Sequence, residues 1–194
     1  MRITGGRLAG RRLEVPRAEV RPTADRVRES LFGRLGDLAG KRVLDLFAGS
    51  GALGFEALSR GAESVVFADR SPPVLATLRK NAERLGVEDA VEVRRGEARA
   101  VLRRLGGGRP FDLVFLDPPY ASGQLDATLA ALASAALLAP EALVVAESDR
   151  RHPPGPVEGL AAIDERRYGD TLITWFVPRG PATAAIRARE ASDA

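Results

Sequence analysis

The 194-residue chain contains no cysteine and only one histidine, His152, which lies beside Pro153 and Pro154. The absence of cysteine excludes disulfide bonds and thiolate chemistry. A lone histidine in a proline-rich loop is expected to be solvated, which argues against a histidine-based metal site or a Ser-His-Asp triad. No run of about 18 apolar residues is present, so we expect no transmembrane helix. The first residues lack the apolar core of a signal peptide, and we therefore expect a cytoplasmic protein.

Lysine is also scarce: Lys41 and Lys80 are the only lysines, and the other basic residues are arginines. The net charge is +3, but residues 1–34 alone carry nine arginines and four acidic residues, a surplus of five positive charges. A basic segment ahead of a nearly neutral body suggests a surface that binds a polyanion, and the guanidinium fork suits phosphate. The alternative explanation is a codon bias toward arginine.

The overall composition, 45% hydrophobic and 28% charged, is that of an ordinary globular domain. Short apolar segments alternate with helical patterns, which predicts βαβ units and a parallel sheet of the α/β class. The expected strands cover residues 42–47, 64–68, 90–94, 111–116 and 142–147, and the expected helices cover 52–59, 72–85, 97–105 and 125–138. The segments 160–168 and 171–177 are too close together for a helix between them, which predicts a final antiparallel hairpin.

The N-terminal segment is expected to form a short arm and a helix ahead of the α/β core. Residues 2–15 contain Gly5, Gly6 and Gly10 and are expected to form a small hairpin or extended arm. A helix should follow over residues 23–35, with Arg28 on its polar side. We therefore expect a basic arm over residues 1–36, a core over 37–178 and a poorly ordered tail over 179–194.

A glycine-rich loop follows the strand expected at residues 42–47. Gly49, Gly51 and Gly54 have the G-x-G-x-x-G spacing between a strand and a helix, and Asp69 ends the next strand. Glycines allow a tight turn and a close approach of the backbone to a ligand, and the carboxylate can bind ribose hydroxyls. Taken alone, the loop fits a nicotinamide dinucleotide or S-adenosyl-L-methionine equally well.

A second loop, Asp117-Pro118-Pro119-Tyr120, directly follows the strand expected at residues 111–116. Two prolines end the strand at its carboxyl end, where open α/β sheets bind ligands. The Asp117 carboxylate and the Pro118 carbonyl can accept the two N–H bonds of an exocyclic amine, which exposes the nitrogen lone pair to a sulfonium methyl group. Tyr120 offers a ring on which an extruded base can stack. This loop favours amine methylation over hydride transfer.

These motifs resemble those of the bacterial 16S ribosomal RNA guanine-N2 methyltransferases. The resemblance covers residues 2–177 and includes the opening Ile3-Thr4-Gly5-Gly6, the two loops above and Tyr168-Gly169-Asp170-Thr171. Its most discriminating part is the segment from Arg21-Pro22-Thr23 to Leu31-Phe32, since unrelated amino-methyltransferases share the two loops. It implies a class I (Rossmann-like) methyltransferase sheet of seven strands in the order 3-2-1-4-5-7-6. The implied cofactor is S-adenosyl-L-methionine, and the implied substrate is 16S ribosomal RNA in an assembling small subunit. The sequence itself contains no exposed apolar helix to spare, so we expect a monomer.

The resemblance also assigns roles to individual residues. Catalysis is expected at Asp117, Pro118, Pro119 and Tyr120. The expected cofactor contacts are Asp45, Phe47, Gly49, Ser50, Gly51, Asp69, Arg70, Glu97 and Ala98, with Asp69 on the ribose and Glu97 near the adenine amine. The expected RNA contacts are Arg7, Arg11, Arg21, Thr23, Arg26 and Arg28.

Three alternatives remain open at this point. DNA adenine-N6 and cytosine-N4 methyltransferases use the same type of Pro-Pro-aromatic turn, although they tend to carry a recognition domain for which this chain has no length. Protein glutamine methylation is a related activity. A non-catalytic assembly factor that binds ribosomal RNA belongs to a different class, and the intact glycines and Asp117 argue against it.

Overall fold

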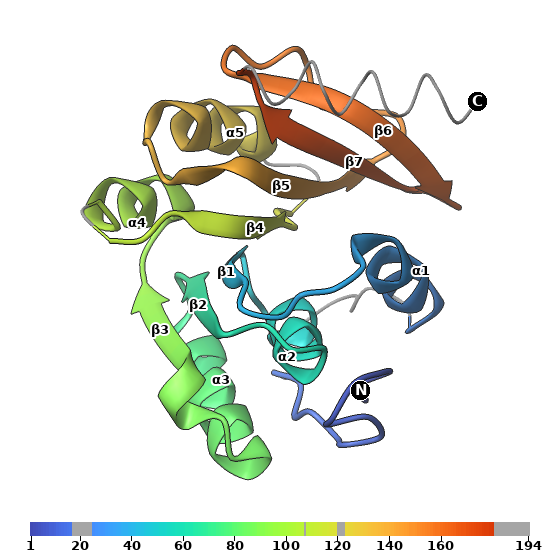
Figure 1. The fold of residues 1–194 in the computed structure, drawn as a ribbon, viewed down its shortest axis with the longest axis vertical. Helices are drawn as coiled ribbons and strands as arrows, with labels where there is room; N and C mark the ends of the chain where they lie inside the picture. Colours follow the sequence, from blue (N-terminus) through green and yellow to red (C-terminus); the bar gives the residue numbers. More distant parts are fainter. Residues whose placement is uncertain (17–24, 107, 120–122, 181–194) are drawn as a thin grey trace. The chain divides into compact units, whose positions relative to one another are not determined.

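The computed structural model of the chain describes residues 1–16, 25–106, 108–119 and 123–180. Its strands form a mostly parallel seven-stranded sheet of order β3-β2-β1-β4-β5-β7-β6. The α/β class, the strand order and the final antiparallel hairpin are confirmed. The chain divides into two compact units, Met1–Val101 and Leu102–Ala194, which are described in turn (Figure 1).

Three parallel strands form the sheet of the first unit: β1 (Arg42–Leu46), β2 (Ser64–Asp69) and β3 (Val91–Arg95). Most residues of β1 and β2 are buried, as expected for parallel strands that are covered on both faces. Helix α2 (Ala52–Ser59) follows β1. Helix α3 (Pro72–Leu85) follows β2 and leads to a short 3-10 turn, η1 (Glu88–Ala90). Proline begins α3 and Gly86, with a φ of 67°, ends it, as the sequence predicted.

The N-terminal residues of this unit form the hairpin predicted over residues 2–15. From here on, the arm means residues 1–16, a shorter segment than the basic arm expected over residues 1–36. Arg2 and Arg12 are partners in an antiparallel bridge, and Ile3, Leu8 and Leu13 are buried. The predicted helix is α1 (Asp25–Leu35), whose Leu31 and Phe32 are buried. The first residues of the predicted helix lie outside the described part of the chain.

The second unit contains the other four strands: β4 (Phe111–Leu116), β5 (Leu138–Asp149), β6 (Leu160–Tyr168) and β7 (Thr171–Pro178). β4 and β5 are parallel, whereas β7 is antiparallel to both β5 and β6. Helix α4 (Ala98–Arg104) begins in the first unit and ends in the second, and α5 (Gln124–Ser134) precedes β5. No helix among the described residues is long and apolar enough to cross a membrane.

The boundary between α5 and β5 differs from the prediction. The helix was expected to reach residue 138, but α5 ends at Ser134, and β5 already begins at Leu138. Ala136 has a φ of 49°, which ends the helix, and the N–H of Phe111 donates to the Leu137 carbonyl at 2.7 Å. Pairing with β4 therefore outweighs the helix propensity of the alanine-rich sequence. The ladder resumes only with Leu143 opposite Leu113, past the proline at position 140.

Candidate active site

The glycine-rich loop of the first unit joins β1 to α2 through left-handed backbone. Phe47, Gly49 and Gly51 have φ values of 62°, 51° and 78°. The N–H of Gly51 donates to the Ala48 carbonyl at 2.7 Å, and the N–H of Ala48 donates to the Ala68 carbonyl of β2 at 3.1 Å. A positive φ at a residue with a side chain costs on the order of 1 kcal/mol, and such residues cluster at ligand sites. Phe47 therefore marks this loop as a candidate binding site.

Two of the three glycines are required by packing within the protein. A Cβ atom on Gly54 would lie 2.2 Å from the Phe67 ring, and one on Gly51 would lie 2.6 Å from Leu78. The N–H of Gly54 donates to the Asp45 carboxylate at 3.0 Å, and Asp45 is only 2% exposed. Asp45 thus holds the start of α2 in place, and its direct contact with a cofactor stays a prediction.

Asp69 ends β2 with its carboxylate beside the glycine-rich loop. One carboxylate oxygen accepts the N–H of Gly49 at 3.3 Å, and the other accepts the N–H of Ser71 at 2.8 Å. The side chain is half-buried. A carboxylate has about four acceptor positions, so two remain for hydroxyl donors such as those of a ribose.

The other predicted cofactor residues of this unit divide into exposed and buried ones. Arg70 and Glu97 form an exposed ion pair at 3.5 Å, with side chains 67% and 59% exposed. Ala98 is buried at the first position of α4. Ser50 is 1% exposed, and its hydroxyl lies 3.8 Å from the Met1 sulfur. The arm covers the Ser50 hydroxyl, and the predicted contact of Ser50 with a cofactor stays a prediction.

A buried asparagine that the sequence analysis missed connects the arm to this loop. The side chain of Asn81 on α3 accepts the N–H of Glu14 at 2.8 Å and donates to the Glu14 carbonyl at 3.0 Å. It also lies 3.3 Å from the Ser50 carbonyl, to which it donates. The Glu14 carboxylate binds Lys80 at 3.0 Å and Arg84 at 2.8 Å. The hydrogen bond and charge of Lys80 lower the pKa of Glu14.

The second predicted loop begins where β4 ends, in the second unit. Asp117 is half-buried, Pro118 is buried and Pro119 is exposed. The change from strand to loop falls at Asp117, as the proline pair predicted. Tyr120 lies outside the described residues. The catalytic role of these residues stays a prediction. In the described part of the chain, no group of three or more histidine or acidic side chains is placed to hold a metal ion.

The arginines predicted to bind RNA have different environments. Arg7 and Arg26 are exposed, and Arg11 is exposed while donating to the Arg84 carbonyl at 2.6 Å. Arg21 and Thr23 lie outside the described residues. Arg28 is 0% exposed, with its Nε 3.5 Å from the Glu56 carboxylate and its Nη2 donating to the Arg2 carbonyl. The assignment of Arg28 to RNA is therefore wrong, because its guanidinium group is buried against protein acceptors.

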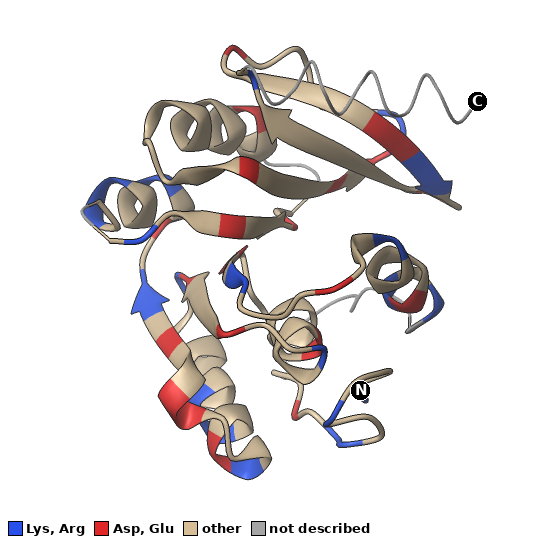
Figure 2. Ribbon diagram, in the orientation of Figure 1, with Lys and Arg blue, Asp and Glu red and all other residues tan. Residues whose placement is uncertain are grey.

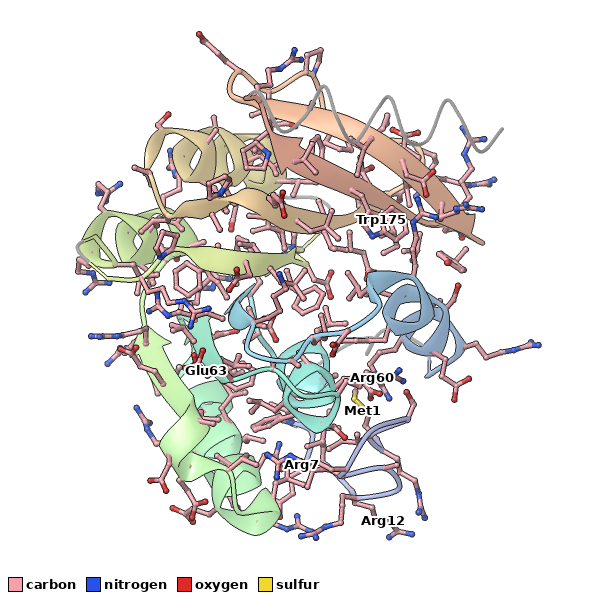
Figure 3. All side chains as sticks on the ribbon, viewed as in Figure 1. Met1, Arg7, Arg12, Arg60, Glu63 and Trp175 are labelled. Atoms are coloured by element: carbon pink, nitrogen blue, oxygen red, sulfur yellow. The ribbon has the colours of Figure 1, made fainter. Side chains whose placement is uncertain are left out.

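Glu56 organises this buried cluster, and the sequence analysis missed it. Its carboxylate accepts the N–H and hydroxyl of Thr4 at 2.8 and 2.7 Å and the N–H of Gly5 at 2.8 Å. Arg60, labelled in Figure 3, binds it at 2.9 Å and lies with its guanidinium carbon 5.2 Å from the centre of the Phe32 ring. We call Glu56, Arg28, Arg60 and Thr4 the Glu56 cluster. Its signal in the sequence is a single charge in the otherwise uncharged helix 52–59.

The chain matches known proteins over nearly its whole length. A family profile described as "Conserved hypothetical protein 95" matches residues 1–177. The "Ribosomal RNA small subunit methyltransferase D" of Escherichia coli K12 is 40% identical over 151 residues, which cover 77% of this chain and 75% of that protein. This chain belongs to the family of that profile, together with ribosomal RNA small subunit methyltransferase D. The Haemophilus influenzae member of the same name is 36% identical over 172 residues, covering 87% of this chain and 89% of that protein.

Solved structures agree with this family assignment. The Escherichia coli protein described as "Putative methyltransferase yhhF" superimposes with a TM-score of 0.80 at 36% identity, covering 92% of this chain and 97% of that one. A Thermus thermophilus protein of the same fold gives a TM-score of 0.78 at 31% identity, covering 90% and 98%. The class I methyltransferase fold and the family predicted from the motifs are both confirmed.

Proposed function

We propose that the chain is an S-adenosyl-L-methionine-dependent methyltransferase that methylates the exocyclic N2 amine of one guanine in 16S ribosomal RNA. The observation that carries the proposal is an Asp117-Pro118 loop directly after β4 in a chain whose family relatives are named for methylation of small-subunit ribosomal RNA. Those names favour RNA over DNA as the nucleic acid. The substrate is an assembling small subunit in the bacterial cytoplasm, and the enzyme acts as a monomer.

The first unit suits the proposed cofactor. The left-handed backbone at Phe47 and Gly49 allows a ligand to approach the loop closely, and the half-buried Asp69 retains acceptor positions for ribose hydroxyls. Arg70, Glu97 and Ala98 complete the proposed contacts at the ends of β2 and β3. When bound, S-adenosyl-L-methionine supplies an electrophilic methyl group on a sulfonium centre.

The Asp117 loop prepares the guanine amine for transfer. The Asp117 carboxylate and the Pro118 carbonyl accept its two N–H bonds, which reduces delocalisation of the nitrogen lone pair into the ring. Tyr120 stacks on the extruded base and fixes its orientation. Bound S-adenosyl-L-methionine would supply the methyl group to the nitrogen with its sulfur as the leaving group, and Asp117 or water would accept the surplus proton from the nitrogen. The exposed Arg7, Arg11 and Arg26, together with Arg21 and Thr23, are the proposed RNA contacts.

The test is incubation of the chain with methyl-labelled S-adenosyl-L-methionine and small subunits that lack the modification, followed by nucleoside analysis. N2-methylguanosine is the expected product. N6-methyladenosine or N4-methylcytosine would instead support the alternative amino-methyltransferases. The absence of any labelled nucleoside, with intact binding to subunits, would support a non-catalytic assembly factor.

Asp117→Ala tests the role of the second loop. The loss of an acceptor that acts on the transition state should lower kcat by about 100- to 1,000-fold, while calorimetry should give an unchanged Kd for S-adenosyl-L-methionine. Asp89→Asn, which neutralises an exposed carboxylate on η1, is the control and should leave both values unchanged. Retention of more than a tenth of the activity in Asp117→Ala would contradict the proposed mechanism.

A further inference from the structure

We infer that the arm carries a phosphate-binding face, centred on Arg2 and Arg12 and supplemented by the charges of Arg7 and Arg11, that holds the RNA backbone. This inference rests on the proposed function for its choice of RNA as the polyanion. It adds Arg2 and Arg12 to the RNA-binding residues and assigns Arg28 to the support of that face. Figure 2 shows the basic segments of the arm, and Figure 3 labels Arg7 and Arg12, both of which are exposed.

The four arginines of the arm are exposed and have no carboxylate partner among the described residues. Within the described ranges, no ion pair involves any of them. The one acidic side chain of the arm, Glu14, instead binds Lys80 and Arg84 of α3. Some exposed arginines elsewhere on the first unit do pair with acids, as Arg70 does with Glu97. The arm therefore presents an uncompensated positive surface.

The bridge between Arg2 and Arg12 adds an unfavourable interaction to the free protein. The two residues are directly opposite in an antiparallel pair, so their side chains project from the same face. Like charges in this arrangement destabilise a pair of strands. An RNA phosphate between the two guanidinium groups would remove that repulsion. The pairing is thus unfavourable for folding and favourable for binding an anion.

The arm is held firmly enough for this face to be formed before RNA binds. The N–H groups of Thr4 and Gly5 donate to Glu56, and those of Arg7 and Leu8 donate to the carbonyl and hydroxyl of Ser59 at 2.7 and 2.9 Å. The guanidinium group of the buried Arg28 holds the Arg2 carbonyl. A prearranged surface loses less conformational entropy on binding, which strengthens the interaction.

The test compares the double variant Arg2→Gln/Arg12→Gln with a control of equal charge, Arg103→Gln/Arg167→Gln, in binding to transcribed 16S ribosomal RNA without cofactor. Each lost phosphate contact should flatten the slope of log K against log salt by about 0.7 to 0.9. Loss of two contacts should therefore lower the ratio of the Kd at 200 mM salt to the Kd at 50 mM salt by about 7- to 12-fold. The control variant should change the slope by less than half as much as the arm variant does. The variant Arg2→Lys/Arg12→Lys, which keeps both charges, should have the slope of the wild type.

Thermal unfolding separates this role from a structural one. The melting temperature of the free Arg2→Gln/Arg12→Gln variant should be unchanged or higher, because a repulsion is removed. Equal salt slopes for the arm variant and the control would overturn the inference. It would also be overturned if the arm variant lost affinity for phosphatidylglycerol vesicles but bound RNA as the wild type does. A failure of the proposed function looks different, since RNA binding would depend on the arm while no methylated nucleoside formed.

Discussion

Glu56→Ala should strongly destabilise the first unit. The substitution removes the acceptor for three hydrogen bonds from Thr4 and Gly5, the contact with Arg60 at 2.9 Å and the ion pair with Arg28. The largest effect comes from Arg28, because it is 0% exposed and would keep a buried charge without its carboxylate. Breaking a buried pair in this way costs about 3–5 kcal/mol, which is a large part of the total stability of an ordinary domain.

Urea unfolding measures this effect. With a slope of about 2 kcal/mol per molar urea, the midpoint followed by far-ultraviolet circular dichroism should fall by roughly 2 M. The fluorescence of Trp175, the only tryptophan, reports on the second unit, so comparison of the two signals shows whether the units unfold together. The control Glu83→Ala removes an exposed carboxylate from α3 and should change stability by at most about 0.5 kcal/mol.

A second measurement tests whether Glu56 holds the arm. Trypsin should cleave after Arg7 and Arg12 faster in Glu56→Ala than in the wild type, because the arm loses its hydrogen bonds to α2. The double variant Glu56→Gln/Arg28→Met should regain part of the stability lost in Glu56→Ala, since it removes the uncompensated buried charge. A Glu56→Ala protein within about 1 kcal/mol of the wild type, with unchanged cleavage of the arm, would refute the assigned role.

Three further predictions concern single contacts. Gly54→Ala should destabilise the protein by about 1–3 kcal/mol or more in urea unfolding, because its Cβ would lie 2.2 Å from the Phe67 ring. Asn81→Leu should weaken S-adenosyl-L-methionine binding in calorimetry, whereas an unchanged Kd would show that the arm does not support the glycine-rich loop. Hydrogen bonds from Arg151 lower the pKa of Asp149, so this pair stabilises the fold above the unfolded pKa of about 4, and the contribution is lost as the pH falls further. In acid titrations followed by circular dichroism, Arg151→Gln should therefore flatten the pH dependence of stability below about pH 4.

The two predicted loops could be found from the sequence because their signals are local. Gly49 and Gly51 directly follow an apolar strand, and the Asp117-Pro118 turn directly follows another, so neither depends on a distant contact. Predictions that depended on distant contacts were less accurate. The end of α5 at Ser134 is decided by the pairing of the following residues with β4, which no local pattern records.

The arginines of the N-terminal segment show most clearly where charge counting stops being informative. Arg12 and Arg28 look equivalent in sequence, because both lie in the arginine-rich segment of residues 1–34. Their roles are separated by Glu56, a residue 28 positions after Arg28, which binds Arg28 in the interior. Arg12 has no carboxylate partner among the described residues and faces Arg2 instead. A buried arginine whose carboxylate is supplied from α2 fixes the backbone of the arm, and this support allows the exposed arginines to remain unpaired. The buried Arg28 therefore supports the exposed arginines that we propose to bind RNA, and a substitution of Arg28 should also weaken RNA binding.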